Sequence, residues 1–343
     1  MKSLLRPTTA DDRGRVRELL RRAFKAPDDA PFLNPSLMAW KYWDPRADWE
    51  GPRGYVMERD GAITAHGAIY PMRLGNLQGA QLIDWAALEE SPGAGVALME
   101  KLQARFDFVY SIGGSEMTCR ILPALGFVER ARQWRGARPI RPLRQILKHQ
   151  HRNWKLAPRL VRNLWWAYPR NPSARLIETW TAEEINSDEV SEGLTCPAGA
   201  SGFSSRPAAF FEYLLRCPVM RVRVYRIRGA DGPGGHFAIG VLREQARVIG
   251  VWPYKADAAA WRAAFALARQ AVVQMGKACE IVAAGTQGSG EQAAVGSGFR
   301  IVRYVPVYVL DRGRKLTLPE DFQFQLCDDD TFCWDSGGSS FWT

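Results

Sequence analysis

The sequence predicts an α/β protein with mixed sheets (α+β): two lobes in tandem, each a mixed twisted sheet flanked by helices. Two observations predict this fold class. Strand-like and helix-like segments alternate along 343 residues, a length sufficient for two domains with separate cores. The second half also repeats the first, because residues 109–127 match residues 281–299 at an offset of 172, including Gly126-Phe127 against Gly298-Phe299.

The repeat extends beyond these two ranges. The motif at residues 4–12 matches residues 176–184 at the same offset, and residues 65–69 echo residues 235–239 at an offset of 170. Small drifts of this kind are what changes in loop length produce. We therefore expect a first lobe over 1–129, a basic, Trp-containing linker over 130–172, a second lobe over 173–312 and an acidic tail over 313–343.

The first lobe begins with an amphipathic helix. Thr9 can cap it, Asp12 suits its first turn, and an apolar face follows at helical spacing: Val16, Leu19, Leu20, Ala23 and Phe24. A second amphipathic segment runs from Asn34 to Trp43 and ends at Asp44-Pro45, where proline stops a helix. Two strand-like runs then flank Asp60-Gly61, a strong hairpin signal.

The stretch from Gln81 to Phe127 forms the centre of this lobe. Its pattern predicts, in order, a strand over 81–88, a turn over 89–95, a helix over 96–106, a strand over 108–112 and a short helix closing on 125–127. The turn contains Ser91-Pro92-Gly93-Ala94-Gly95, whose glycines allow a tight bend and close approach of a ligand. The following helix directs unpaired N–H groups and its positive dipole end at that ligand, which predicts an anion site suited to phosphate.

A strand, a Gly-x-Gly turn, a helix, a second strand and a closing Leu-Gly-Phe resemble the coenzyme A-binding core of the GNAT acyltransferase superfamily, over about 120 residues from Leu4 to Val128. The resemblance implies that acetyl-CoA or another acyl-CoA is the donor, with no metal. It implies that the donor binds at Leu88, Ser91, Pro92, Gly93, Ala94, Gly95 and Val96.

The sequence departs from the family pattern at three positions. Glu90 stands where the family has Arg or Gln, and a carboxylate beside a pyrophosphate is unfavourable. The family's frequent tyrosine acid corresponds to Leu122 in the first lobe and to Ala294 in the second. The second lobe has Tyr254–Ala258 in place of the glycine turn, so we expect the donor in the first lobe and a structural role for the second.

Acyl transfer to an amine needs a group that accepts the amine's proton. The candidates on or beside the central strand are Asp84, Glu89 and Glu116. Asp84 is favoured because a carboxyl on a half-buried strand can have a raised pKa, although a structural bond to a neighbouring strand is an equal interpretation. A backbone N–H near Leu88 is expected to polarise the acyl carbonyl.

The net charge of +10 arises from one segment, because residues 130–170 contain twelve Lys and Arg and no acid. Interleaved with tryptophans, this segment has three interpretations: a site for RNA, an interfacial surface for an anionic membrane, or a linker packed on its apolar side. We favour the linker, and an acidic acyl carrier protein would also suit such a surface. The acidic tail can dock on this segment or remain mobile.

The remaining patterns exclude several classes of protein. The six cysteines and four histidines show no metal-ligand spacing, which favours scattered reduced thiols. Without a visible signal peptide or membrane span, a cytoplasmic location is expected, with contact at a membrane periphery left open. The sequence thus predicts a tandem acyltransferase that transfers its acyl group to a small-molecule amine. The alternatives are a Fem-like aminoacyl-tRNA-dependent or carrier-protein-dependent transferase, and a non-catalytic binding protein on the duplicated fold.

Overall fold

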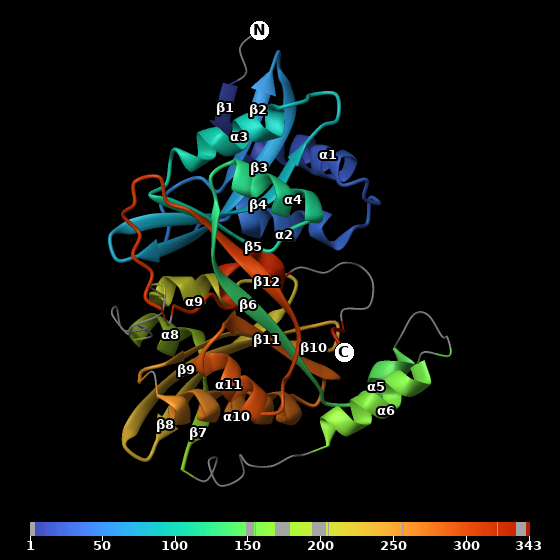
Figure 1. The fold of residues 1–343 in the computed structure, drawn as a ribbon, viewed down its shortest axis with the longest axis vertical. Coiled ribbons are helices and arrows are strands. Elements are labelled where there is room, and N and C mark those ends of the chain that lie inside the picture. Colours follow the sequence, from blue (N-terminus) through green and yellow to red (C-terminus); the bar gives the residue numbers. More distant parts are fainter. Residues whose placement is uncertain are drawn as a thin grey trace. The chain divides into compact units, whose positions relative to one another are not determined.

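The computed structural model describes residues 4–148, 154, 156–168, 179–193, 204, 206–255, 257–320, 322–333 and 341–343 (Figure 1). The chain forms two compact units. Unit 1 comprises Met1–Arg130, Pro306–Thr317 and Asp328–Asp330, and unit 2 comprises Ala131–Val305, Leu318–Cys327 and Thr331–Thr343.

The first repeat contains ten regular elements: β1 (Leu4–Pro7), α1 (Arg13–Ala23), α2 (Pro35–Tyr42), β2 (Gly54–Arg59), β3 (Ala62–Leu74), β4 (Leu77–Ala87), α3 (Ala94–Gln103), β5 (Phe108–Ile112), α4 (Glu116–Ala124) and β6 (Val128–Pro139). The second repeat has the same elements in the same order: β7 (Thr181–Ile185), α8 (Ser187–Gly193), α9 (Ala208–Leu215), β8 (Arg221–Gly229), β9 (Gly232–Leu242), β10 (Gln245–Pro253), α10 (Ala258–Met275), β11 (Glu280–Thr286), α11 (Ser289–Gly296) and β12 (Arg300–Leu310). The predicted tandem fold is confirmed.

Residues 109–127 and 281–299 show the repeat most directly. Each range holds a strand and a short helix, and each then ends at a glycine with positive φ, Gly126 at 91° and Gly298 at 89°, followed by a buried phenylalanine. A residue with a Cβ is strained at that φ, so glycine ends both helices for the same reason. The first motif of the second repeat, at 176–177, lies outside the described residues.

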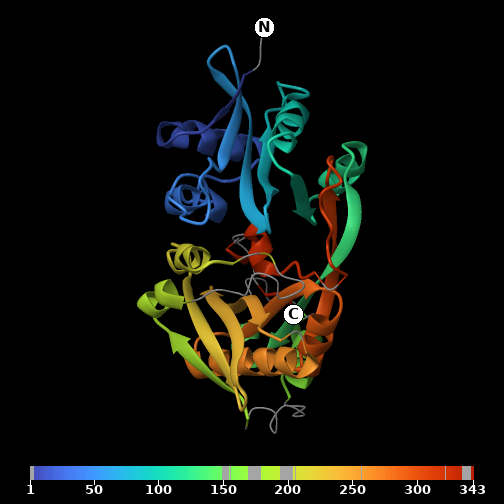
Figure 2. The ribbon, with the colours of Figure 1, turned by 90° about the vertical axis from the view of Figure 1, so that its left-hand side faces the viewer.

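In each unit the sheet is antiparallel except at one central pair. In unit 1 the order is β1-β2-β3-β4-β5-β12, with β4 and β5 parallel. Helices α1 and α2 (blue) cover one face and α3 (teal) covers the other (Figure 2). In unit 2 the order runs β12-β6-β11-β10-β9-β8-β7, with β10 and β11 parallel, and α10 packs on β9 and β10. The core of unit 2 includes Phe237, Ile281 and Phe299.

The closing strands of the two sheets are exchanged between the repeats. The antiparallel partner of β5 is the end of β12, where Val307 faces Ile112, and β6 instead pairs with β11, where Arg138 faces Ile281. Residues 130–139, expected to begin a linker, are therefore mostly a strand of unit 2. Trp134 anchors this strand because its side chain is 1% exposed and packs in that unit's core.

The linker continues as two helices, α5 (Pro142–Leu147) and α6 (Leu156–Ala167), with residues 149–153 and 155 between them outside the described part. Parts of the acidic tail pack against the rest of the chain. Asp328 and Asp329 are buried, and Thr343 docks on the basic segment, where its carbonyl oxygen accepts from Arg159 Nε at 2.8 Å and its Oγ1 from Gln145 Nε2 at 2.8 Å. Docking of the tail is thus confirmed for residues 341–343; residues 334–340 lie outside the described set.

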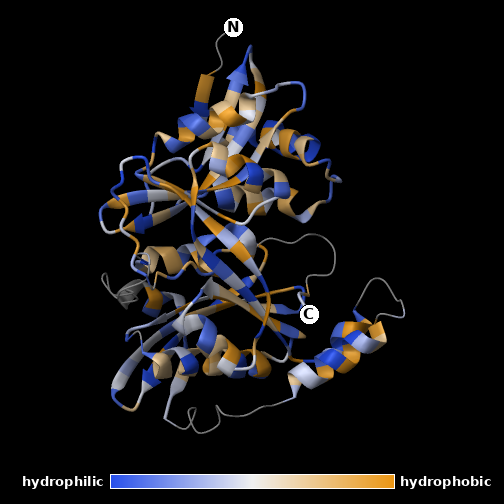
Figure 3. Cartoon of the chain, viewed as in Figure 1, coloured by the Kyte–Doolittle hydropathy of each residue, from blue (hydrophilic) through white to orange (hydrophobic). Residues whose placement is uncertain are grey.

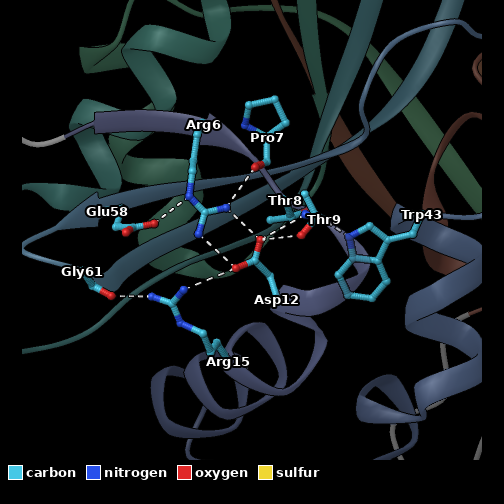
Figure 4. Close-up of polar contacts among 9 residues, drawn as sticks. All are labelled: Arg6, Pro7, Thr8, Thr9, Asp12, Arg15, Trp43, Glu58 and Gly61. Carbon is cyan, nitrogen blue, oxygen red and sulfur yellow. Dashed lines mark hydrogen bonds and ion pairs between the residues drawn. The ribbon is translucent and has the colours of Figure 1, made fainter.

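The expected capping contact forms between Thr9 and Asp12, at a short 3-10 turn over Ala10–Asp12 that leads into α1 (Figure 4). The Asp12 carboxylate accepts from the Thr9 backbone N–H at 3.0 Å and pairs with Arg6 Nη1 at 2.7 Å. Arg6 also reaches Glu58 on β2 at 2.6 Å, so the cap joins the start of the helix to the sheet. The hydrogen bond from Arg6 lowers the pKa of Asp12 to about 2, although burial opposes the shift.

Candidate functional site

The central parallel strands of unit 1 separate towards their carboxyl ends. Strand β4 pairs with β5 only from Gly79 to Gln81. From there to Ala87 it remains paired with β3 but no longer with β5. Its register with β3 shifts between His66 and Ala68, which makes a bulge at Asp84, where φ is 49°. A bulge of this kind twists a strand away from its neighbour. The backbone of β4 is therefore open to a ligand on the side facing β5.

The glycine turn follows directly at the end of β4. Gly93, with φ of 80°, precedes α3, and among the described residues no side chain caps that helix. The first bond of the helix runs from Ala97 N to Gly93 O, so the amides of Gly95 and Val96 have no partner within the helix. Trp85 Nε1 donates to Gly95 O at 2.9 Å and holds the turn against the strand. Amides left without a partner at a helix start can bind an anion, so the turn is compatible with the site predicted at residues 91–96.

A cleft of about 440 Å³ lies beside this turn in unit 1. Its lining is largely charged and comes from the last turn of α1 with the residues after it and from the segment after β4: Arg21, Arg22, Ala23, Lys25, Ala26, Leu88, Glu89 and Glu90. Two ion pairs span it. Arg22 Nη2 lies 2.5 Å from Glu90 Oε1, and Lys25 Nζ lies 2.8 Å from Glu89 Oε1.

Asp84 lies in a buried polar cluster. Its carboxylate accepts from Lys41 Nζ and from the Tyr42 hydroxyl at 2.6 Å, and Lys41 Nζ also lies 2.6 Å from Asp330 Oδ2. Burial acts to raise the pKa of Asp84, but the charge and hydrogen bond of Lys41 outweigh it, so the pKa is lowered. The raised pKa expected for Asp84 is therefore wrong, because the strand pattern could not reveal Lys41.

For the neighbours of Asp84, burial outweighs the nearby charges and sets the direction of the pKa shift. It raises the pKa of Asp330, with the charge of Asp84 adding to the shift and Lys41 opposing it. It lowers the pKa of His66 to about 4, so that this imidazole is neutral near pH 7. His66 Nδ1 lies 3.1 Å from the carbonyl oxygen of Asp84, and its Nε2 is buried with no hydrogen-bond partner in the described residues. The cluster therefore joins β3, β4 and α2 to the tail segment at 328–330.

The structure does not bring the three predicted bases together in one polar cluster. Glu89 is exposed and paired with Lys25, and Glu116 begins α4, where it is exposed and pairs with Arg120 at 2.5 Å. The backbone N–H of Leu88 donates to Thr64 O at 3.1 Å. This amide is already bonded within the sheet, so the expectation that it polarises an acyl carbonyl does not fit the structure.

Comparison of the two repeats gives another candidate for the amide that polarises the acyl carbonyl. His66 faces Ala86 in unit 1, and His236 faces Trp252 in unit 2, so Trp85 occupies the position of Val251. The Val251 amide points into the opening of its sheet, where it donates to Gln325 Oε1 at 2.6 Å. The amide of Trp85 in unit 1 corresponds to that of Val251 by this register.

Unit 2 lacks the features of a phosphate site. Asp257 caps α10 by accepting from Ala260 N at 2.7 Å, which places a carboxylate where an anion would bind. The opening between β10 and β11 is crossed by the chain itself. Gln325 binds Val251, and the Phe324 N–H donates to Thr286 Oγ1 on β11 at 2.7 Å.

The positions of the family's tyrosine hold buried apolar side chains, Leu122 at 1% exposure and Ala294 at 0%. No phenol can protonate a leaving thiolate from either place.

The arginines of the basic segment make contacts within unit 2. Arg138 is 3% exposed and donates to Ser297 O at 2.6 Å, and burial lowers its pKa to about 10. Arg141 donates to Ala278 O at 3.0 Å, and Arg144 pairs with Glu244 at 2.8 Å. Figure 3 shows apolar and polar residues on different sides of α6, and several apolar side chains there are exposed: Val161, Leu164, Trp165 and Tyr168. Arg152 and Lys155 lie outside the described residues.

Other site types receive little support. In the part of the chain that the structure describes, no group of three His, Cys, Asp or Glu side chains could hold a metal ion, and no helix is long and apolar enough to cross a membrane. None of the cysteines described there is in a disulfide bond: Cys119, Cys217, Cys279, Cys327 and Cys333. Cys196 falls outside those ranges.

Comparison with known proteins gives matches at the level of structure. A GCN5-related N-acetyltransferase from Anabaena variabilis matches 90% of this chain and 73% of its own, with a TM-score of 0.56 and 12% identity. A tandem GNAT protein from the clavulanic acid biosynthesis pathway matches 92% of this chain and 100% of its own, with a TM-score of 0.54 and 13% identity. A GCN5-related N-acetyltransferase from Kribbella flavida matches 90% and 71%, with a TM-score of 0.53 and 12% identity.

No protein-family model and no curated protein sequence matches the chain. The matching order of elements in the two repeats and the tandem structural match agree with each other. The chain therefore has the fold of the GCN5-related N-acetyltransferases, with two copies of that fold in tandem.

Proposed function

We propose that this protein transfers an acyl group from a coenzyme A thioester to an amine, and that the donor binds unit 1 at the turn from Ser91 to Val96. The observation that carries the proposal is the contrast between two helix N-termini. That of α3 follows Gly93 and has no side-chain cap among the described residues, whereas that of α10 carries the Asp257 carboxylate. Phosphate oxygens suit the first site and are repelled by the second.

The open part of β4 suits the remainder of the donor. An acyl carbonyl beside the bulge can accept a hydrogen bond from the Trp85 amide, which stabilises the oxyanion that develops as the amine attacks. The structural matches include proteins named N-acetyltransferases, which supports an acyl group as the cargo. Acetyl is the proposed acyl group, and a small-molecule amine is the proposed acceptor.

Proton removal from the amine must use a group other than Asp84. The lowered pKa of Asp84 makes it a weak base, and its carboxylate already accepts from Lys41 and Tyr42. Glu89 follows the end of β4 and lines the cleft, whereas Glu116, which is equally exposed, begins α4 and does not line it, so Glu89 is the acid that we assign to this role. An ordered water between the amine and this carboxylate would complete the proton path.

A non-catalytic role as an acyl-CoA-binding protein is the second candidate. Two observations favour it: Asp84 is held in the buried cluster, and apolar side chains replace the tyrosine in both repeats. Binding at the turn would then occur without transfer.

The release of free coenzyme A thiol from acetyl-CoA in the presence of a panel of amines separates the two candidates. Transfer predicts amine-dependent thiol release by the wild-type protein and its loss in Gly93→Asp, which adds a negative charge and backbone strain at φ of 80°. Gly61→Asp is the matched control, because Gly61 has φ of 76° and, like Gly93, has no described heavy atom within 4 Å of an added Cβ. Acetyl-CoA binding without thiol release for any amine would favour the binding protein.

A further inference from the structure

The cleft between the end of α1 and the segment after β4 is lined by three cationic and two anionic side chains. Arg21, Arg22 and Lys25 line it, against the carboxylates Glu89 and Glu90. Arg21 is directed to its own helix, where it pairs with Glu18 at 2.7 Å. Arg22 and Lys25 face the segment that leads into the glycine turn, through their pairs with Glu90 and Glu89.

These two ion pairs are exposed. The side chains of Arg22 and Glu90 are 47% and 57% exposed, and those of Lys25 and Glu89 are 78% and 80% exposed. Exposed pairs contribute little to stability because water screens them and because two long side chains must be ordered. Either cation can therefore leave its carboxylate for a more highly charged anion at small cost.

Glu90 stands immediately before the turn and brings negative charge to a place where phosphates are proposed to bind. A doubly charged anion near Glu90 needs a cation beside it, because backbone amides supply only partial charges. Arg22 already lies 2.5 Å from Glu90, and a guanidinium can bind a phosphate through two parallel N–H groups.

We propose that Arg22 and Lys25, from the end of α1, are the cationic ligands for the phosphate groups of the coenzyme A donor. This assignment rests on the proposed function and names the residues that replace the cation missing from the turn. Glu90 and Glu89 hold the two cations at the cleft until the phosphates bind. In the simpler alternative Arg22 only neutralises Glu90, and the two roles predict different behaviour in a double variant.

The test is isothermal titration of the full chain with coenzyme A and with 3′-dephospho-coenzyme A. Arg22→Gln and Lys25→Gln are each expected to weaken coenzyme A binding on the order of tenfold, the usual effect of losing one hydrogen bond to a charged group. Arg17→Gln is the control, since it removes one cation from the same helix but does not line the cleft, and its guanidinium donates to Asp28 O. Equal losses with both ligands place the contact at the pyrophosphate, and a loss confined to coenzyme A places it at the 3′-phosphate.

Glu90→Gln separates ligation from neutralisation. As a ligand, Arg22 predicts that Glu90→Gln alone binds coenzyme A at least as tightly as wild type, and that adding Arg22→Gln still weakens binding about tenfold. Wild-type affinity in the Arg22→Gln/Glu90→Gln double variant would overturn the proposal, as would unchanged affinity in both single variants.

The proposed function fails differently. If Gly93→Asp retains wild-type binding while Arg22→Gln weakens it, the glycine turn is not the site, but the cleft still is. If Gly93→Asp abolishes binding and Arg22→Gln and Lys25→Gln leave it unchanged, only the present inference is wrong. If the wild-type chain binds no coenzyme A, both are wrong.

Discussion

Lys41 is the residue on which the buried cluster of unit 1 depends. Its side chain is 3% exposed and lies between the carboxylates of Asp84 and Asp330. Lys41→Met leaves two buried carboxylates without a cation, and we expect a loss of about 3–5 kcal/mol in the free energy of unfolding. Asp84→Asn leaves Lys41 paired with Asp330 and should cost less. Urea denaturation checks both, and a Lys41→Met protein as stable as wild type would contradict the assigned role.

Asp12 predicts a pH dependence of stability. Its folded pKa of about 2 is below the ordinary value of 3.8, so its contribution is fully present above about pH 4 and is lost as the pH falls towards 2. The shift corresponds to about 2 kcal/mol. Asp12→Asn should therefore be less stable than wild type at pH 7, and the difference should shrink below pH 3. A difference that stays constant from pH 7 to pH 2.5 in urea titrations would show that the ion pair with Arg6 contributes nothing.

At this scale the sequence predicts contacts between near neighbours and misses distant ones. The spacing of Thr9 and Asp12 was enough to predict the cap of α1, because both partners lie in one turn. The sign of the Asp84 pKa shift depends on Lys41, which is 43 residues away, and no local pattern contains that contact. The Trp85 amide likewise emerges only from the register of β4 against β3.

Among the elements, α10 offers a direct comparison with α3. Asp257→Ala removes the cap of α10, and we expect a loss of about 1 kcal/mol in stability. We expect no gain of coenzyme A binding, because Gln325 and Phe324 still cross the opening of the sheet. Thermal denaturation and titration with coenzyme A measure the two effects. A second binding site in this variant would show that Asp257 alone excludes the donor from unit 2.

The basic segment comprises most of β6 and the helices α5 and α6, and it is either a packed linker or a binding surface. Arg138 is part of the core of unit 2, so its replacement would test packing rather than surface charge. Arg144→Ala, which breaks an exposed pair with Glu244, is the cleaner variant. On the linker interpretation, we expect little change in stability and no binding to RNA, anionic vesicles or an acidic carrier protein at physiological salt.

A steep salt dependence of binding would show that this segment binds a charged partner. A partner held by charge binds strongly at low salt and weakly as the Debye length falls from about 10 Å at 0.1 M to about 3 Å at 1 M. Arginine-dependent binding with that profile, measured by vesicle or RNA co-sedimentation, would overturn the linker interpretation. The engagement of Arg141 and Arg159 with backbone oxygens of unit 2 supports the linker.

For elements, periodicity predicted α1, the hairpin at Asp60-Gly61 and the central strand–turn–helix unit with small errors at their ends. It placed most of β6, residues 130–139, in a linker because a strand rich in arginine does not show the usual apolar alternation. Two arginines on that strand, Arg135 and Arg138, are buried in unit 2, which a charge count cannot indicate.

At the scale of the whole molecule, the sheet of each unit includes a closing strand from the other repeat. A fragment of residues 1–130 lacks residues 306–310, which pair with β5, and lacks Asp330, which pairs with Lys41. An unpaired strand edge favours aggregation, and the cluster loses one carboxylate. We expect this fragment to be aggregated or unfolded by size-exclusion chromatography and circular dichroism, and co-expression with residues 131–343 to restore a soluble complex. A stable monomeric fragment would show that the exchanged strand is dispensable.

The duplication itself was legible in the sequence because loop lengths have drifted by only a few residues between the repeats. The exchange was not, because β6 and β12 follow equivalent helices and either could close either sheet. Which one does so is decided by side chains such as Trp134, whose Nε1 donates to Thr286 O at 3.1 Å.

The central claim is that only one of the two repeats binds the donor, and that binding requires its glycine turn. Titration calorimetry of the full chain with coenzyme A tests it most directly. The predicted result is one molecule bound per chain, with binding lost in Gly93→Asp and retained in Gly61→Asp and Asp257→Ala. Two molecules bound per wild-type chain, or unchanged affinity in Gly93→Asp, would contradict the claim.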